Sequence, residues 1–178
     1  VADETYVTLH NGSDVARQTK CWPTRNWTVL ADNLLSRGLK VIQLGAAGDA
    51  PIERGIDMRG RTTLKEAAAL IAGARFHIDT EGGLVHVARA VRTRSIVLFG
   101  PTPAGFFGYD TNINLETEEP CKGCWWRNGL WWRECPNKYT GGPKCMPGIT
   151  PEKVIAAVTV MQAMPDLPER FKPMDINE

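Results

Sequence analysis

"RFHIDTEGGLVHVARAVRTRSIVLFG", residues 75–100, is the stretch that decides the fold. Residues 75–79 read as a short strand, residues 82–91 as a helix that opens on two glycines, and residues 95–100 as a buried apolar strand. The connections between them are only a few residues long. Strands that alternate with helices through short connections are typical of a parallel sheet covered by helices.

The same alternation extends over the rest of the chain. Further strands are expected at 5–9 and 40–44, and further helices at 24–38, 62–74 and 150–164. The apolar stripes of these helices are Trp27, Leu30, Ala31, Leu34 and Leu35, then Leu64, Ala67, Ala68 and Ile71, and finally Val154, Ile155, Val158 and Met161. The expected caps are Thr24, Thr63 with Glu66, Thr150 with Pro151, and Gly38 at the end of the first helix. We therefore predict an α/β domain with a Rossmann-like open parallel sheet and helices on both faces.

Composition limits the class of protein. The chain has 178 residues, 43% of them apolar and 23% charged, which suits one globular domain. A net charge of +1 provides no overall basic field for nucleic acid or an anionic membrane. The chain also starts without Met, so we expect a processed product or an excised piece of a longer protein.

Four loops follow predicted strands, and they are the candidates for a binding site. They are "HNGSD" and the residues up to Lys20, then "GAAGD", "TEGG" and "GPTPAG". Because ligands of open parallel sheets bind beyond the carboxyl ends of the strands, we expect all four loops at one edge.

The loop residues suggest a nucleotide diphosphate site. Gly82 and Gly83 open a helix, where free N–H groups attract a phosphate, and His86 follows one turn later. Lys20 can neutralise a phosphate and Asp49 can hold ribose hydroxyls. For each residue a plainer interpretation stays open, as a turn glycine, a packed histidine or a solvated lysine. The Walker pattern is absent, which argues against ATP hydrolysis.

At this point the order of motifs resembles a known family. The pieces "YVTLHNGSD…TKCWP…NWTVLADNLLSRGLKVIQLG", "RGRTTLKEAAALIAGARFHIDTEGGLVHVARAV…SIVLFGPTP" and "CMPGITPEKV" are similar to glycosyltransferase family 9, the heptosyltransferases. The resemblance covers about residues 5–162. It implies the C-terminal, donor-binding half of a GT-B enzyme, with 1–178 as one domain and an N-terminal acceptor-binding domain as its missing partner.

The resemblance also implies site residues and a reaction. Lys20 and Glu81 are the candidates for electrostatic or positioning roles in catalysis, with Gly82 where many members have Thr or Ser. The expected donor-binding residues are Asn11, Gly12, Ser13, Lys20, Gly45, Asp49, Glu81, Gly82, Gly83, His86 and Thr102. The implied reaction is inverting transfer of a sugar from a nucleotide-diphosphate sugar, commonly ADP-heptose, to a glycan or lipid-linked acceptor, without a required metal. The implied location is the cytoplasm, with peripheral attachment at the inner membrane as a variant of it.

Residues 117–149 form a separate Cys/Trp-rich lobe, and 165–178 are expected to be a loose tail. Cys121, Cys124, Cys135 and Cys145 have the spacing C-x2-C-x10-C-x9-C. A structural zinc or iron ion, disulfides, and free packing thiols all stay open. One branch of the resembled family holds iron with four such cysteines and assembles through them.

The tryptophans of this lobe raise a further question. Trp125, Trp126, Trp131 and Trp132 are too many to bury in one small lobe, so some are expected to pack on the domain or in self-association. Arg127 and Arg133 beside them could stack on a base. Two alternatives to a glycosyltransferase therefore stay open, a non-catalytic nucleotide-sugar-binding or assembly module, and a metalloprotein that binds nucleic acid through a Trp-rich knuckle.

Overall fold

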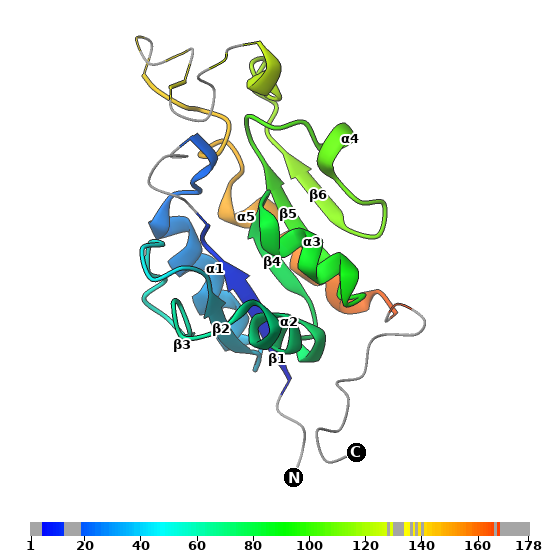
Figure 1. Ribbon diagram of the computed structural model, residues 1–178. Helices are drawn as coiled ribbons and strands as arrows, with labels where there is room; N and C mark the ends of the chain where they lie inside the picture. Colours follow the sequence, from blue (N-terminus) through cyan, green and yellow to red (C-terminus); the bar gives the residue numbers. More distant parts are fainter. Residues whose placement is uncertain are drawn as a thin grey trace.

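The protein folds around one six-stranded parallel sheet. The computed structural model describes residues 5–12, 19–127, 129, 134–135, 137, 139, 141–165 and 167. The strands are β1 (Tyr6–His10), β2 (Lys40–Leu44), β3 (Ile56–Asp57), β4 (His77–Thr80), β5 (Ser95–Phe99) and β6 (Ile113–Glu116). Their order is β3-β2-β1-β4-β5-β6, and every neighbouring pair is parallel (Figure 1). The predicted open parallel sheet is confirmed.

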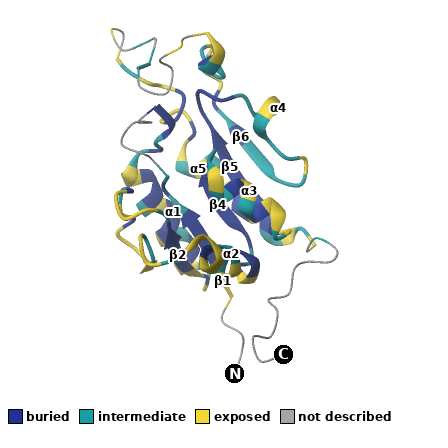
Figure 2. Cartoon of the chain, viewed as in Figure 1, coloured by how far each residue is buried: buried dark blue, intermediate teal, exposed yellow. Residues whose placement is uncertain are grey.

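Helices cover both faces of the sheet, as predicted. They are α1 (Thr24–Ser36), α2 (Leu64–Gly73), α3 (Gly83–Ala90), α4 (Ala104–Phe107) and α5 (Pro151–Ala163), with a 3-10 turn η2 (Cys124–Trp126). Helices α1 and α5 contribute to one hydrophobic cluster, and α2 and α3 contribute to another. The central strands β1, β4 and β5 are almost entirely buried between these layers (Figure 2).

In helix α1 most, but not all, residues of the predicted apolar stripe are buried. Trp27, Leu30 and Leu34 are fully buried, but Leu35 is 40% exposed, so its assignment to the core was wrong. The stripe on this helix is narrower than the full run of apolar residues. The residue before the helix, Pro23, occupies the cap position expected for Thr24, which instead begins the helix.

The start of α2 and the start of α5 form as the sequence predicts. The Thr63 side chain accepts from the Glu66 backbone, and the Glu66 carboxylate accepts from the Thr63 backbone at 2.7 Å, which completes the capping box. Thr150 caps α5 through the Lys153 backbone. Leu64 was expected in the core but is 68% exposed, and it lines a pocket instead.

Three elements were not predicted, namely β3, β6 and α4. Strand β3 has two exposed residues and α4 is a single turn, so neither carries a detectable period. Strand β6 is short and only partly buried. The two strands are the edges of the sheet.

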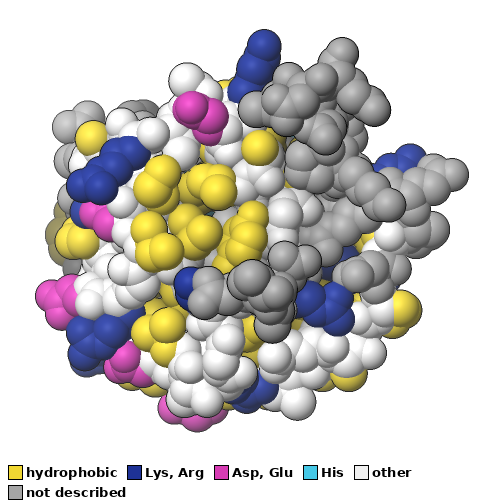
Figure 3. Space-filling model, turned by 90° about the horizontal axis from the view of Figure 1, so that it is seen from below, with side chains coloured by type: hydrophobic (Ala, Val, Ile, Leu, Met, Phe, Trp, Pro, Cys, Tyr) yellow, Lys and Arg dark blue, Asp and Glu magenta, His cyan; other side chains and the backbone are white. Residues whose placement is uncertain are grey.

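At the end of the molecule where the strands begin, the described side chains form no surface of a single charge. Figure 3 views this end and shows hydrophobic side chains grouped together, with basic and acidic side chains around them. No helix among the described residues is long and apolar enough to cross a bilayer.

Candidate functional site

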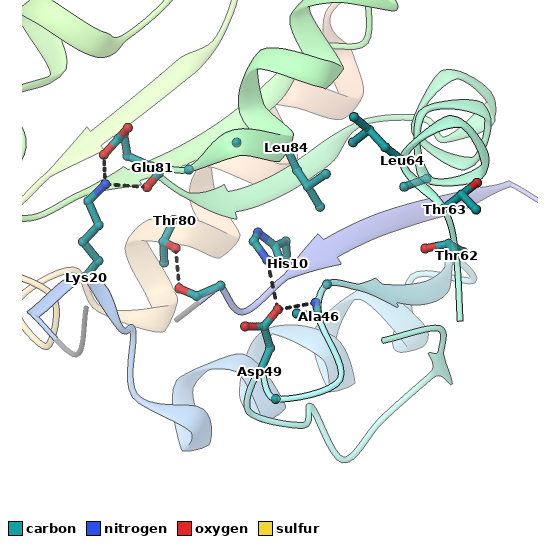
Figure 4. Close-up of a pocket in the computed structure, with 16 residues that line it drawn as sticks. His10, Lys20, Ala46, Asp49, Thr62, Thr63, Leu64, Thr80, Glu81 and Leu84 are labelled. Atoms are coloured by element: carbon teal, nitrogen blue, oxygen red, sulfur yellow. Dashed lines mark hydrogen bonds and ion pairs between the residues drawn. The ribbon is translucent and has the colours of Figure 1, made fainter. Parts of the chain in front are cut away.

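The loops after β1, β2 and β4 meet in a pocket at the carboxyl edge of the sheet (Figure 4). Its volume is about 550 Å³, within the roughly 300–1,000 Å³ of typical small-molecule sites. The residues that line it are His10, Gly12, Lys20, Gly45, Ala46, Gly48, Asp49, Thr62, Thr63, Leu64, Ala67, Thr80, Glu81, Gly82, Gly83 and Leu84. The parallel sheet produces this convergence because its strands all end at the same edge.

An ion pair stands at one side of the pocket. The Lys20 ammonium contacts the Glu81 carboxylate and also donates to the Glu81 carbonyl oxygen at 3.0 Å. The two side chains are only 11% and 10% exposed. A largely desolvated lysine therefore lies directly before the start of α3.

Helix α3 begins with an open N-terminus beside this lysine. Gly82 occupies the cap position and Gly83 is the first helical residue, and within the described chain no side chain caps the helix. A Cβ on Gly83 would meet no atom within 4 Å. The first amides of α3 therefore face a region that an anion can enter.

Asp49 forms the opposite side of the pocket. Its Oδ2 accepts from the Ala46 backbone at 2.7 Å and from His10 Nε2 at 3.3 Å. The residue is 8% exposed. The carboxylate is thus held in a defined position on the loop after β2.

A buried chain of polar groups continues from Asp49 into the sheet. His10 Nδ1 lies 2.8 Å from Asp79 Oδ1, His77 Nε2 lies 3.4 Å from Asp79 Oδ2, and His77 Nδ1 lies 2.9 Å from the Thr8 hydroxyl. Burial disfavours the charged form of His10, but the charges and hydrogen bonds of Asp79 and Asp49 outweigh it and raise its pKa to about 10. For Asp79 burial is likewise outweighed, by His10 and then His77, and its pKa is lowered. His10 is therefore an imidazolium between two carboxylates.

Several predicted site residues lie elsewhere. His86, expected to face the phosphate site, is on the exposed side of α3 and its Nδ1 bonds to the Tyr109 hydroxyl at 2.8 Å. Asn11 and Thr102 are buried and do not line the pocket. Ser13 lies outside the described residues. The predicted residues that do come together are Gly12, Lys20, Gly45, Asp49, Glu81, Gly82 and Gly83.

The sequence interpretation missed other parts of the pocket. His10, Thr80 and the stretch 62–64 all line it. His10 is the last residue of β1 and lies opposite Asp79 in the sheet register. A histidine at the end of one strand and an aspartate near the end of another could have indicated the site. The local sequence of the two strands, however, does not determine the register that places them opposite each other.

The cysteines of the lobe are gathered but unbonded. None of the five cysteines is in a disulfide in the structure, in contrast to the disulfide alternative. Asn137 donates to Cys121 Sγ at 3.1 Å and to Cys135 Sγ at 3.4 Å. Burial and then the other thiols of the group raise the pKa of Cys124, and burial raises that of Cys145 to about 11. Within the described part of the chain, no three His, Cys, Asp or Glu side chains already form a ligand set.

The lobe is attached to the sheet through backbone hydrogen bonds. Gly123 N donates to Gly100 O at 3.0 Å, and Trp125 N donates to Pro101 O at 2.8 Å. The Trp125 ring packs against Phe107 with centroids 5.3 Å apart. The base of the lobe is therefore continuous with the loop after β5.

The remaining aromatic residues of the lobe give only a partial test of the stacking prediction. Trp126 is 67% exposed and the Arg127 guanidinium lies 5.1 Å from its ring centroid. Trp131, Trp132 and Arg133 lie outside the described residues.

Comparison with known proteins agrees with the geometry. The profile of glycosyltransferase family 9 (heptosyltransferase) matches residues 2–125. Lipopolysaccharide heptosyltransferase 1 of Pseudomonas aeruginosa is 27% identical over 163 residues, which cover 83% of this chain and 46% of the relative.

Two solved structures share the fold. The dodecameric iron-containing heptosyltransferase TibC in complex with ADP-D-β-D-heptose superposes with a TM-score of 0.75 at 21% identity, covering 91% of this chain and 46% of that one. ADP-heptose LPS heptosyltransferase II of E. coli gives a TM-score of 0.69 at 19% identity, with 90% and 47% covered. The chain thus spans less than half the length of these relatives.

The family profile extends across every loop that forms the pocket. It includes Lys20, the loop that carries Asp49 and the glycines at the start of α3. The chain belongs to glycosyltransferase family 9, the heptosyltransferase family.

Proposed function

We propose that this chain is the donor-binding half of an inverting glycosyltransferase that transfers a heptose-like sugar from a nucleotide-diphosphate sugar to a lipopolysaccharide-type acceptor. One observation carries the proposal. Lys20 and the uncapped start of α3 converge in a single pocket at the sheet edge, where they can receive a diphosphate. The TibC structure contains ADP-D-β-D-heptose and that of the E. coli heptosyltransferase WaaC contains ADP, which supports an adenosine diphosphate sugar.

The proposed chemistry places the diphosphate as leaving group. The acceptor hydroxyl oxygen forms a bond to the anomeric carbon while the bond from that carbon to the diphosphate oxygen breaks on the opposite face. Lys20 and the first amides of α3 stabilise the charge that develops on the diphosphate, and such a preorganised donor contributes about 2.7–4 kcal/mol. Because these groups supply the positive charge, the transfer step requires no metal. The hydroxyl proton passes to a base in the acceptor-binding half.

Glu81 gives the proposed site a mechanism for receiving the donor. In the ligand-free pocket its carboxylate and carbonyl hold the Lys20 ammonium. Donor binding exchanges this contact for one between Lys20 and the diphosphate, which leaves Glu81 to position the sugar. His86 keeps its proposed role as a phosphate ligand only if it exchanges its bond to Tyr109.

The nucleoside is assigned to the other side of the pocket. Asp49 is held where a carboxylate can accept from ribose hydroxyls. Leu64 and Leu84 also line the pocket and provide apolar surface for a base. The donor then lies with its ribose at Asp49 and its diphosphate at Lys20.

The partners follow from the same proposal. The acceptor and the general base belong to an N-terminal domain that faces the pocket, and a lipid-linked acceptor implies work at the cytoplasmic surface of the inner membrane. The assembly-module and nucleic-acid alternatives are not favoured, because the family match covers the pocket itself.

Calorimetric titration tests the proposal. We expect ADP to bind the wild-type chain, and Lys20→Ala to weaken ADP at least about tenfold while adenosine binding changes less than about twofold. Lys65→Ala is the control, because this lysine is exposed on α2 and does not line the pocket. Absence of ADP binding by the wild type, or equal weakening of ADP and adenosine by Lys20→Ala, would refute it.

We also propose that the four clustered cysteines hold a structural zinc or iron ion. The residue types fit, because thiolates suit both metals, and the thiols lie close enough to affect one another's ionisation. Asn137 already donates to two of the sulfurs, as outer-shell groups of metal sites do. Bound metal would brace the lobe against the loop after β5.

Metal analysis of freshly purified protein tests this second proposal. We expect close to one equivalent in the wild type and loss of it in Cys124→Ser, with Cys21→Ser as the control outside the cluster. Less than about half an equivalent in the wild type, or equal metal in both variants, would contradict it.

A further inference from the structure

His10 is the central residue of the pocket floor, although the proposed reaction gives it no task. It ends β1, and its ring connects that strand to Asp79 on β4 and to Asp49 on the loop after β2 (Figure 4). Its side chain is 14% exposed and Asp79 is fully buried. One ring therefore joins three segments that are far apart in the sequence.

The surrounding glycines show that the site is built around this ring. A Cβ on Gly12 would lie 2.8 Å from His10 Nδ1, and one on Gly45 would lie 3.0 Å from His10 Cδ2. The first contact is shorter than Cβ atoms show in folded proteins, and the second is tighter than nine in ten of them. Two bare backbone segments that line the pocket therefore rest on the His10 ring.

The hydrogen bonds determine how His10 can act. Both ring N–H groups donate to carboxylates, so neither is available to a ligand. The charged groups that face the ring are Asp79 from β4 and Asp49 from the loop after β2, with His77 behind Asp79. Across the pocket Lys20 and Glu81 form their own pair. His10 must therefore influence a bound molecule through Asp49.

We propose that His10 is a positioning residue for the nucleoside end of the donor, because its imidazolium fixes the Asp49 carboxylate on the pocket wall. This inference rests on the function proposed above. Asp49 Oδ2 is held from two directions, by His10 Nε2 and by the Ala46 backbone. Loss of the first contact removes the histidine that holds this oxygen, so ribose binding weakens while diphosphate binding does not.

Two variants of His10 separate the two hydrogen bonds. The amide nitrogen of Gln can take the place of Nε2, and that of Asn can take the place of Nδ1. His10→Gln therefore keeps the contact with Asp49, whereas His10→Asn keeps only the contact with Asp79. His77→Gln is the control, because His77 bonds to the same Asp79 but is fully buried and does not reach the pocket.

The measurement is calorimetric binding of ADP and of inorganic pyrophosphate by folded variants. We expect His10→Asn to weaken ADP about tenfold, and His10→Gln and His77→Gln to weaken it less than about threefold. Pyrophosphate binding should change less than about twofold in all three. Asp49→Asn combined with His10→Asn should be no worse than Asp49→Asn alone. Equal loss in the Asn and Gln variants, parallel loss of pyrophosphate, or additive losses would overturn the inference.

A second measurement uses the unmodified, ligand-free chain. In nitrogen-15 NMR both His10 ring nitrogens should be protonated at pH 8. A neutral His10 ring at pH 8 overturns the inference, even if every variant fails to fold. Failure of the wild type to bind ADP overturns the proposed function and with it the role of His10 in donor binding. If the wild type binds ADP but the effects of His10→Asn and Asp49→Asn are additive, only the inference about His10 is overturned.

Discussion

Gly83→Ala, at the start of α3, should weaken ADP binding without lowering the stability of the fold. A Cβ on Gly83 would meet nothing within 4 Å, and the residue is the first of the helix. Alanine in a helix is more stable than glycine by about 0.5–1 kcal/mol, with a smaller gain at the first position. We therefore expect the free energy of unfolding to be unchanged or slightly higher.

The same methyl group projects into the space proposed for the diphosphate. If it costs one hydrogen bond between a backbone amide and a phosphate, ADP binding loses about 1.5–3 kcal/mol, which is roughly a 10- to 150-fold rise in Kd. The assay is calorimetric titration with ADP, accompanied by denaturant unfolding of the same preparations.

Gly105→Ala provides a matched control for this substitution. Gly105 lies in the first turn of α4, and a Cβ there also meets nothing within 4 Å, but it does not line the pocket. We expect its ADP affinity to equal that of the wild type. An ADP affinity of Gly83→Ala within about twofold of the wild type would refute the reasoning, because a phosphate then would not approach the start of α3.

Two further predictions concern stability. The pKa of His10 rises from 6.5 to about 10 in the folded chain, so its contribution is complete below pH 6.5 and is lost between pH 6.5 and about 10, by up to about 5 kcal/mol at 1.36 kcal/mol per pH unit. Asp79, whose pKa is lowered from 3.8, adds a second loss of the free energy of unfolding as the pH falls below 3.8. Cys145, with a pKa of about 11, also loses stabilisation as the pH rises. The free energy of unfolding should therefore be measured at pH 7, 8.5 and 10 for the wild type and for His10→Gln. An equal dependence on pH in both proteins would show that His10 is not the cause of the loss. Thr63→Ala should lower the free energy of unfolding by about 1 kcal/mol through loss of the capping box, with Thr28→Ala, inside α1, as a comparison; no change relative to that comparison would contradict the cap.

The sequence predicted those parts of the fold that depend on local patterns. The capping box at Thr63 and Glu66 involves residues three apart, so it is visible without knowledge of the tertiary structure. The β4–α3–β5 unit was readable because an apolar run, two glycines and a helical period follow one another. Leu35 and Leu64 were misplaced because an apolar residue at the margin of a stripe can face either the sheet or solvent.

The candidate site was predictable to the extent that topology alone determines it. Parallel strands bring the loops with Lys20, Asp49 and Gly82 to one edge, whatever the register. His10 and Asp79 required the register itself, because 69 residues separate them in the chain. His86 lies away from the pocket because of the orientation of α3. Val85 and Ala88 are the buried residues of this helix, so His86 lies on its outer side, where its ring bonds to the Tyr109 hydroxyl.

The two backbone hydrogen bonds at the base of the Cys/Trp-rich lobe have a consequence for how this family can vary in length. Gly123 and Trp125 donate to Gly100 and Pro101, directly after β5, and one extra residue between 123 and 125 would break that pairing. Insertions and deletions among relatives should therefore accumulate beyond Trp126 and spare positions 123–125.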